Sequence, residues 1–178
     1  AISGLNLIYG WFVLPETLPP ENRRAFEWGR SNPFGAFRVF ARYGSVLPLC
    51  AILGVYFMAS AVYPAIWTFW GMAKFGWSDG LTLAAFGLIT AIFQGFVTGP
   101  AVARHGEWRV CLFGLAIAVV VAVGYGLAGS LAAVLVLLVI HGPEGFVHPM
   151  LVAMMSKAVP EDAQGELQGG IAAVMNIA

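Results

Sequence analysis

Three long stretches without a charged side chain constrain this sequence more than any other feature. No Asp, Glu, Lys or Arg occurs between Arg42 and Lys74, between Asp79 and Arg104, or between Arg109 and Glu144. A bilayer core about 30 Å thick is crossed by roughly 20 apolar residues of α-helix, so each stretch has room for one or two crossings. Buried helices of a soluble protein would be shorter and would keep a polar face. The sequence therefore predicts an all-α, polytopic membrane protein.

The composition agrees with a membrane protein. Hydrophobic residues make up 60% of the chain, charged residues make up 10%, and the mean hydropathy is +0.82. Soluble proteins are about 45–50% apolar and about 25% charged. The net charge of zero gives no reason to expect a nucleic-acid partner. Cys50 and Cys111 lie inside apolar stretches without metal-ligand spacing, so we interpret them as packing residues and expect no metal site.

The apolar runs predict a short first helix, a connector and five membrane segments. Residues 1–14 are too few to cross a membrane alone, and residues 15–44 form a polar, arginine-rich connector. The predicted spans are 45–67, 81–101, 110–128, 131–151 and an incomplete 167–178. The tight turn at Gly129 and Ser130 predicts that the third and fourth spans form an antiparallel hairpin. We expect the chain to be a fragment, because it begins without Met and ends inside an apolar run.

The basic residues predict the orientation of these spans. Alternating the loops places residues 15–42, 102–109 and 156–166 on one side of the membrane. Of the nine Lys and Arg residues, only Lys74 lies on the other side. Cytoplasmic loops are enriched in Lys and Arg, so these three loops are predicted to be cytoplasmic. We expect the membrane to be the inner membrane of a bacterium.

The segment from Gly99 to Arg109 reads GPAVARHGEWR. It resembles the cytoplasmic loop motif G-x-x-x-D-R-x-G-R-R of the major facilitator superfamily. Gly106 permits a tight turn with positive φ, and Arg104 and Arg109 are suited to the carbonyls of a helix C-terminus and to lipid headgroups. Ala103 stands where the family has Asp, so the family's Asp–Arg pairing is not expected. The alternative interpretation is an ordinary basic turn.

Three further segments resemble the tetracycline-resistance-like drug:proton antiporters of this superfamily, in family order. They are the ends of helix six (9–18), the approach to helix seven (32–38) and the loop between helices ten and eleven (156–169). The resemblance implies a superfamily-type helical bundle containing the end of helix six, helices seven to ten and the start of helix eleven. It also implies an N-terminal half as partner and a proton gradient as energy source, with no cofactor. Thr90 and Ala118 stand where the resemblance implies His and Asp.

The function predicted from these features is secondary active transport, not enzyme catalysis. The resemblance implies proton-coupled efflux of a drug-like or amphipathic solute, and thus antibiotic resistance. The expected partners are the lipid bilayer, a small-molecule substrate and protons. A carrier for a metabolite is the alternative, because few cavity residues set the substrate in this fold. A remote alternative is an intramembrane enzyme using the ionisable residues of the fourth span, although these lack the HExxH pattern of zinc hydrolases.

The fourth predicted span carries His141, Glu144 and His148, which are our candidates for a proton or substrate pathway. Ionisable side chains at membrane depth are costly and usually face a cavity or a partner. The spacing of four residues predicts that Glu144 and His148 share one helix face. The alternative is that these groups only hydrogen-bond to a neighbouring helix. Gln94, in the second span, is a weaker candidate of the same kind.

Five aromatic residues are further candidates for the lining of a drug cavity, and the alternative is that they face lipid or pack helices. They are Phe57, Tyr63, Trp67, Phe93 and Phe96.

Overall fold

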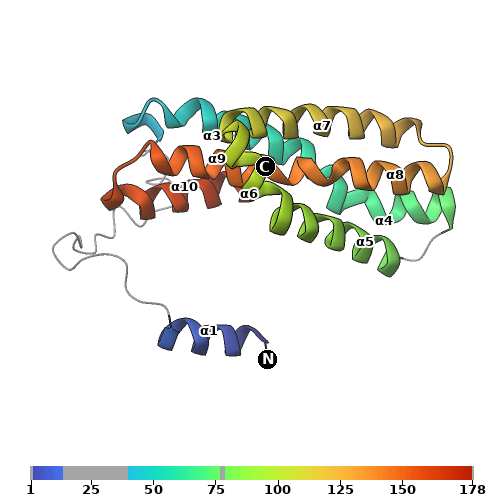
Figure 1. Cartoon of the computed structure of the whole chain (residues 1–178), viewed down its shortest axis with the longest axis horizontal. Coiled ribbons are helices and arrows are strands. Elements are labelled where there is room, and N and C mark those ends of the chain that lie inside the picture. The colour runs from blue at the N-terminus through green and yellow to red at the C-terminus, as the bar shows by residue number, and fades with distance from the viewer. Residues whose placement is uncertain (1, 14–39, 77–78, 178) are drawn as a thin grey trace.

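The computed structural model describes residues 2–13, 40–76 and 79–177, and these residues contain helices and no strand (Figure 1). The α-helices are α1 Ile2–Val13, α3 Val46–Ser60, α4 Val62–Phe75, α5 Asp79–Ile92, α6 Thr98–His105, α7 Glu107–Leu127, α8 Leu131–His141, α9 Val147–Lys157 and α10 Gln164–Ile177. The short irregular helices are η2 Phe93–Val97, η3 Gly142–Phe146 and η4 Glu161–Ala163. The predicted all-α class is confirmed.

Among the described residues, four helical runs are long and apolar enough to cross a membrane. They are Val46–Phe75, Ala84–His105, Glu107–Leu127 and Leu131–Lys157. Each run corresponds to one of the predicted spans, but the first is longer than predicted, since residues 68–75 are helical instead of a loop. The helix ends at Gly76, whose φ of 63° is a left-handed conformation that favours glycine.

The predicted hairpin of the third and fourth spans is present. α7 and α8 lie side by side in Figure 1 and are joined by residues 128–130. The Ser130 hydroxyl accepts a hydrogen bond from the Ala133 amide at 3.2 Å and so caps the N-terminus of α8. Gly124 permits the close approach of the two helices, because a Cβ there would lie 2.6 Å from Leu137 Cδ2.

The turn between α6 and α7 is tighter than the predicted loop 102–109. Gly106 alone separates the two helices, with φ 79° and ψ 158°, a conformation essentially limited to glycine. On the far side of this turn, Glu107 Oε1 lies 2.6 Å from Lys157 Nζ at the end of α9. Arg104 and Arg109 are exposed and have no side-chain hydrogen bond to another described residue. The predicted role of these arginines in capping α6 is therefore not observed.

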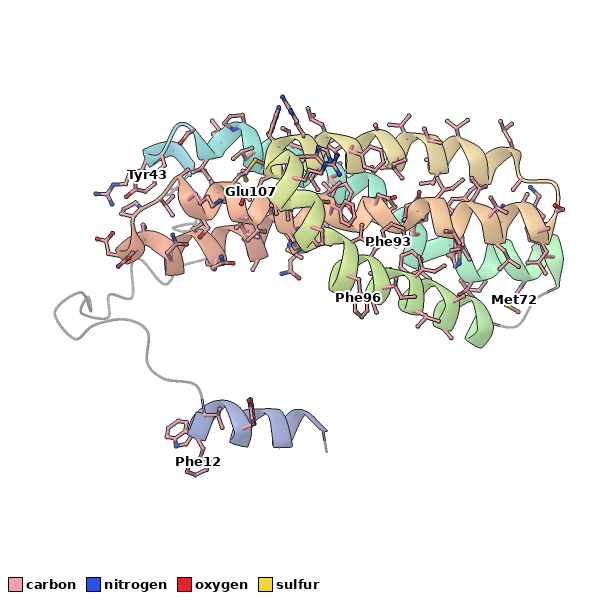
Figure 2. The ribbon with its side chains drawn as sticks, in the orientation of Figure 1. Phe12, Tyr43, Met72, Phe93, Phe96 and Glu107 are labelled. Atoms are coloured by element: carbon pink, nitrogen blue, oxygen red, sulfur yellow. The ribbon has the colours of Figure 1, made fainter. Side chains whose placement is uncertain are left out.

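A buried core joins α3, α7, α9 and α10. Its fully buried members include Leu53, Cys111, Leu151, Met155 and Leu167. Both cysteines are free and buried, in agreement with packing roles. Large apolar side chains also cover the outside of the bundle, as Met72 and Phe96 illustrate in Figure 2. An apolar exterior of this kind is expected where helices face lipid.

The resemblances at residues 15–18 and 32–38 lie outside the described residues. The segment 156–166, predicted as a loop, contains the end of α9, η4 and the start of α10. Gln164 closes this connection, because its side chain hydrogen-bonds to the Ser156 hydroxyl and carbonyl at 2.8 Å each.

Candidate functional site

The fourth span changes its winding at its centre. Glu144 is the central residue of Leu131–Lys157, and it lies in the 3₁₀ segment η3. Pro143 lacks an amide hydrogen, and Gly142 and Gly145 lie on the two sides of the Pro143–Glu144 pair. A regular α-helix is therefore weakened here. Irregular backbone at membrane depth is tolerated where it is buried in protein or lines a cavity. The irregular winding therefore coincides with the residues that least favour a regular α-helix.

Glu144 forms a buried pair with His141. The carboxylate atom Oε2 lies 2.9 Å from His141 Nε2, and both side chains are more than 90% buried. A 3₁₀ turn brings residues three apart onto one side, which explains why the partner is His141. The Oε2 atom makes no hydrogen bond of good geometry. The nearby imidazole of His141 is therefore the polar group that offsets the cost of burying this oxygen. The other oxygen, Oε1, accepts a long hydrogen bond of 3.4 Å from Ser60.

The second nitrogen of His141 has its own partner. The Tyr125 hydroxyl lies 3.1 Å from His141 Nδ1, across the α7–α8 hairpin. When the hydroxyl donates to Nδ1, the ring hydrogen of a neutral His141 is on Nε2 and faces Glu144. A continuous polar chain therefore runs from Tyr125 through His141 and Glu144 to Ser60, with its members drawn from three helical runs.

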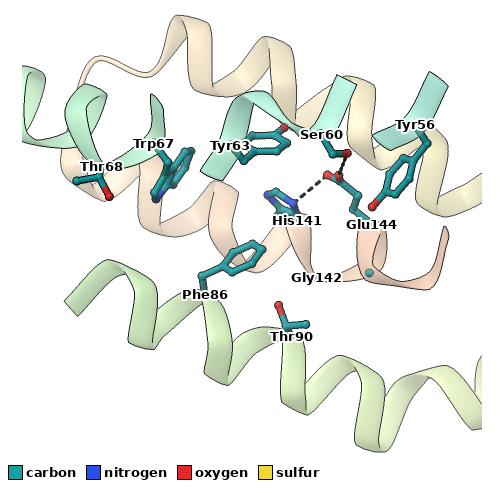
Figure 3. Close-up of a pocket in the computed structure, with 11 residues that line it drawn as sticks. Tyr56, Ser60, Tyr63, Trp67, Thr68, Phe86, Thr90, His141, Gly142 and Glu144 are labelled. Carbon is teal, nitrogen blue, oxygen red and sulfur yellow. Dashed lines mark hydrogen bonds and ion pairs between the residues drawn. The ribbon is translucent and has the colours of Figure 1, made fainter. Parts of the chain in front are cut away.

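A cavity of about 340 Å³ adjoins this chain (Figure 3). It is lined by Tyr56, Ser60, Tyr63, Trp67, Thr68, Phe86, Thr90, His141, Gly142, Glu144 and Gly145. Residues of α3 and α4 form one wall, α5 contributes Phe86 and Thr90 on the opposite side, and the 3₁₀ segment lies between them. The volume falls in the range of small-molecule sites, which are about 300–1,000 Å³.

The sequence-based pairing of Glu144 with His148 is wrong. His148 instead packs edge-on against Phe57, with ring centroids 5.5 Å apart, and it does not line the cavity. Gln94 is exposed and lies near η3, with its Nε2 3.7 Å from the position of a Cβ on Gly145, but it too is absent from the cavity lining. Of the four predicted pathway residues, the structure brings together only His141 and Glu144.

The four residues of the cytoplasmic loop motif are not part of the site around His141 and Glu144. Gly99, Arg104, Gly106 and Arg109 belong to α6, its turn and the start of α7, and none of them lines the cavity.

Of the five aromatic candidates, Tyr63 and Trp67 line the cavity, and Phe57, Phe93 and Phe96 do not. Tyr56, Ser60 and Tyr125 were not among the residues predicted for the site. A signal for the first two existed, because Tyr56, Ser60, Tyr63 and Trp67 follow the spacing of one helix face. Apart from Phe57, most other residues of this span are aliphatic, so polar or aromatic residues at that spacing stand out.

A π-helical segment, η2, supports the 3₁₀ segment from the side. η2 interrupts the second span, and Thr98 compensates the altered ladder by donating its hydroxyl to the Phe93 carbonyl at 3.0 Å. Phe93 packs directly on Gly142, where a Cβ would lie 2.3 Å from two atoms of the ring. Gly142 therefore brings the two irregular segments together beside the cavity, and π-bulges of this kind are frequent at functional sites.

The sequence profile of the Major Facilitator Superfamily matches residues 1–178 of this chain. The chain is 35% identical over 185 residues to tetracycline resistance protein, class C, of Escherichia coli, which covers 99% of this chain and 45% of that protein. It is 35% identical over 153 residues to tetracycline resistance protein, class G, of Vibrio anguillarum, which covers 83% of this chain and 38% of that protein. The chain spans less than half the length of these relatives, and no solved structure matches it significantly.

Proposed function

Because the chain belongs to the major facilitator superfamily, we propose that the protein is a secondary active transporter that exports a drug-like solute in exchange for protons. The observation that carries this proposal is the buried His141–Glu144 pair, which lies at the centre of a span and faces a cavity. The names of the relatives favour drug export over transport of a metabolite. Membership of a transporter family also favours transport over the intramembrane enzyme.

The pair is suited to hold and release one proton. With the proton bound, an imidazolium and a carboxylate lie 2.9 Å apart and the site is neutral. After the proton leaves, Glu144 is an uncompensated charge in a low-dielectric site, and such a charge is costly. The deprotonated state therefore favours the binding of either a new proton or a substrate that compensates the charge. Because the two compete for the same carboxylate, the export of substrate is coupled to the import of protons.

His141 also supplies an imidazole that the second span lacks. The resemblance implies a His at Thr90, and Thr90 lines the same cavity as His141. Coupling in this chain would then use an imidazole from the fourth span in place of one from the second. This difference supports a substrate range that is not restricted to tetracycline.

The orientation predicted from the basic residues belongs to the same proposal. The turn at Gly106 and the connection between α9 and α10 would face the cytoplasm of a bacterial cell, and Gly76 and Gly129 would lie on the outer side. The His141–Glu144 pair would then lie near mid-membrane, because it is central in its span.

The experiment is proton exchange in everted membrane vesicles that contain the full-length protein. A pH-sensitive dye reports acidification of the interior, and tetracycline or ethidium is then added as substrate. We expect the substrate to discharge the pH gradient in wild type and not in Glu144→Gln, which keeps the shape and removes the charge. The matched control is Glu107→Gln, which removes a carboxylate at the end of α7 far from the cavity and should exchange normally.

Two results would contradict the proposal. If Glu144→Gln exchanges protons as fast as wild type, the carboxylate is structural and does not couple. If neither substrate discharges the gradient in wild type, proton-coupled drug export is wrong.

A further inference from the structure

The turn between α6 and α7 carries positive charge that nothing in the described structure neutralises. Arg104 lies in the last turn of α6 and Arg109 in the first turn of α7, and Gly106 alone separates the two helices. Both arginines are exposed, and neither forms an ion pair with another described residue. The one carboxylate of this turn, that of Glu107, is paired with Lys157 at 2.6 Å. The two guanidinium groups are therefore available to an anion.

The winding of α7 keeps Glu107 away from Arg109. Successive residues of an α-helix are rotated by about 100°, so these two side chains leave α7 about 200° apart, on nearly opposite sides. Glu107 is directed toward Lys157 at the end of α9, and Arg109 lies on the outer face. The other described carboxylates at this end of the bundle lie on η4 and α10, and α10 packs on α3 and α9. An anion beside Arg109 therefore meets no carboxylate on α7.

The outer face of α7 continues from Arg109 as an exposed apolar stripe. At helical spacing it consists mainly of Leu112, Phe113, Val119, Val120, Val123 and Leu127, all of which are exposed. With 21 residues, α7 is about 31 Å long, which matches a hydrocarbon core of about 30 Å. Trp108 lies beside Arg109 at the start of the stripe and is also exposed, and tryptophan is enriched at the membrane–water interface. One continuous surface thus has a cationic end and an apolar length.

We propose that this surface binds one anionic phospholipid, whose phosphate contacts Arg104 and Arg109 and whose acyl chains lie along the outer face of α7. Guanidinium groups suit a phosphate because their N–H donors form a planar fork that matches its oxygens. The exposed apolar stripe suits the acyl chains, because the two surfaces are equally apolar and similar in length. The inference goes beyond the proposed function, because it does not depend on which solute the protein exports.

The charges at the turn select the class of headgroup. Phosphatidylglycerol has a net charge of −1 and an uncharged glycerol, so the arginines meet only its phosphate. The ammonium group of phosphatidylethanolamine would lie beside two guanidinium groups, and like charges placed together are unfavourable. A free carboxylate could compensate the ammonium, but Glu107 is paired with Lys157, and the exposed residue beside Arg104 is Ala103. The turn therefore favours phosphatidylglycerol over phosphatidylethanolamine.

The test is a competition between these two lipids for the full-length protein. Phosphatidylglycerol and phosphatidylethanolamine with identical acyl chains are added in equal amounts to the protein in a neutral detergent. Native mass spectrometry then counts the molecules of each lipid that stay bound. We expect phosphatidylglycerol to be retained in preference. Glycerol 3-phosphate in excess should not displace it, because this probe has the phosphate without the acyl chains.

Variants locate the effect at the turn. Arg104→Gln and Arg109→Gln should each weaken the binding of phosphatidylglycerol about fivefold, and the double variant about thirtyfold, as expected for basic residues beside anionic lipid. Ala103→Asp keeps both arginines and adds a carboxylate beside them, so it should reduce the preference for phosphatidylglycerol. The matched control is Lys74→Gln, which removes one exposed positive charge beside the ring of Trp70, at the end of α4, and should leave the preference unchanged.

Three results would overturn the inference. They are equal retention of the two lipids by wild type, undiminished retention of phosphatidylglycerol in the double variant, and its displacement by glycerol 3-phosphate. Circular dichroism in the same detergent checks that each variant is folded, as expected for substitutions of exposed side chains. Because no transport is measured, selective retention in a protein whose vesicles show no proton exchange would support the lipid site and refute only export.

Discussion

Replacement of Gly142 by Ala tests the contact between the two irregular segments. A Cβ at this position would lie 2.3 Å from Cδ2 and Cε2 of Phe93 and 2.7 Å from its Cγ, closer than real Cβ contacts. Because Cγ lies on the axis about which the ring turns, a ring rotation leaves this atom in place, and η2 or η3 has to move. Overpacking of this kind costs about 1–3 kcal/mol.

The matched control lies in the same 3₁₀ segment. At Gly145 a Cβ would meet only Gln94 Nε2, at 3.7 Å, which is ordinary van der Waals contact. Both Gly→Ala changes gain about 0.5–1 kcal/mol from the lower backbone entropy of the unfolded chain, so this term cancels between them. Gly142→Ala is therefore expected to be less stable than Gly145→Ala by about 1–3 kcal/mol.

The assay is unfolding of the two purified variants in the same detergent, followed by circular dichroism. The double variant Gly142→Ala with Phe93→Leu should recover part of the lost stability, because the clashing ring is gone. If Gly142→Ala and Gly145→Ala unfold together, the close contact of η2 with η3 does not exist in the protein, and the shape of the cavity would have to be reconsidered.

The remaining predictions concern the turn and the topology. Gly106→Leu should lower the stability by about 1–3 kcal/mol in the same unfolding assay, because φ 79° with ψ 158° strains any residue other than glycine; wild-type stability would contradict this backbone geometry. Single-cysteine variants at Ser31, His105 and Glu161, in a protein without its native cysteines, should resist an impermeant maleimide added to intact cells, whereas Gly76→Cys should react. Reaction at Ser31 from outside would refute the orientation.

Much of the fold could be predicted from the positions of charged residues. The spans follow from charge-free stretches because an unpaired charge in lipid is costly whatever the neighbouring helices are. The tight turns followed from Gly106 and Gly129, which are local signals. The end of the first span was misplaced because the aromatic residues before Gly76 suit both a membrane interface and a helix.

The site could be predicted only in part, because its contacts depend on how distant helices are aligned. Ser60 meets Glu144 across 84 positions of the chain, and Tyr125 meets His141 across the hairpin. No local pattern specifies the depth at which two helices pack. The error at His148 has a different origin, since the spacing of four assumes a regular α-helix from Glu144 to His148, whereas the chain is a 3₁₀ helix as far as Phe146.

The 3₁₀ segment rotates the two halves of the fourth span relative to each other about the helix axis. Each 3₁₀ residue turns the chain by about 20° more than an α-helical residue, so five of them add about 100°, the rotation of a single α-helical residue. Accordingly, Val147, Leu151 and Met155 are buried below the segment, where an uninterrupted helix would have buried His148 and Val152. Gly142–Phe146 thus acts like an inserted residue that the sequence does not contain. It lets one half of the span present its face to the cavity and the other half to the core, and a homologue with regular winding would need one additional residue here to keep both faces.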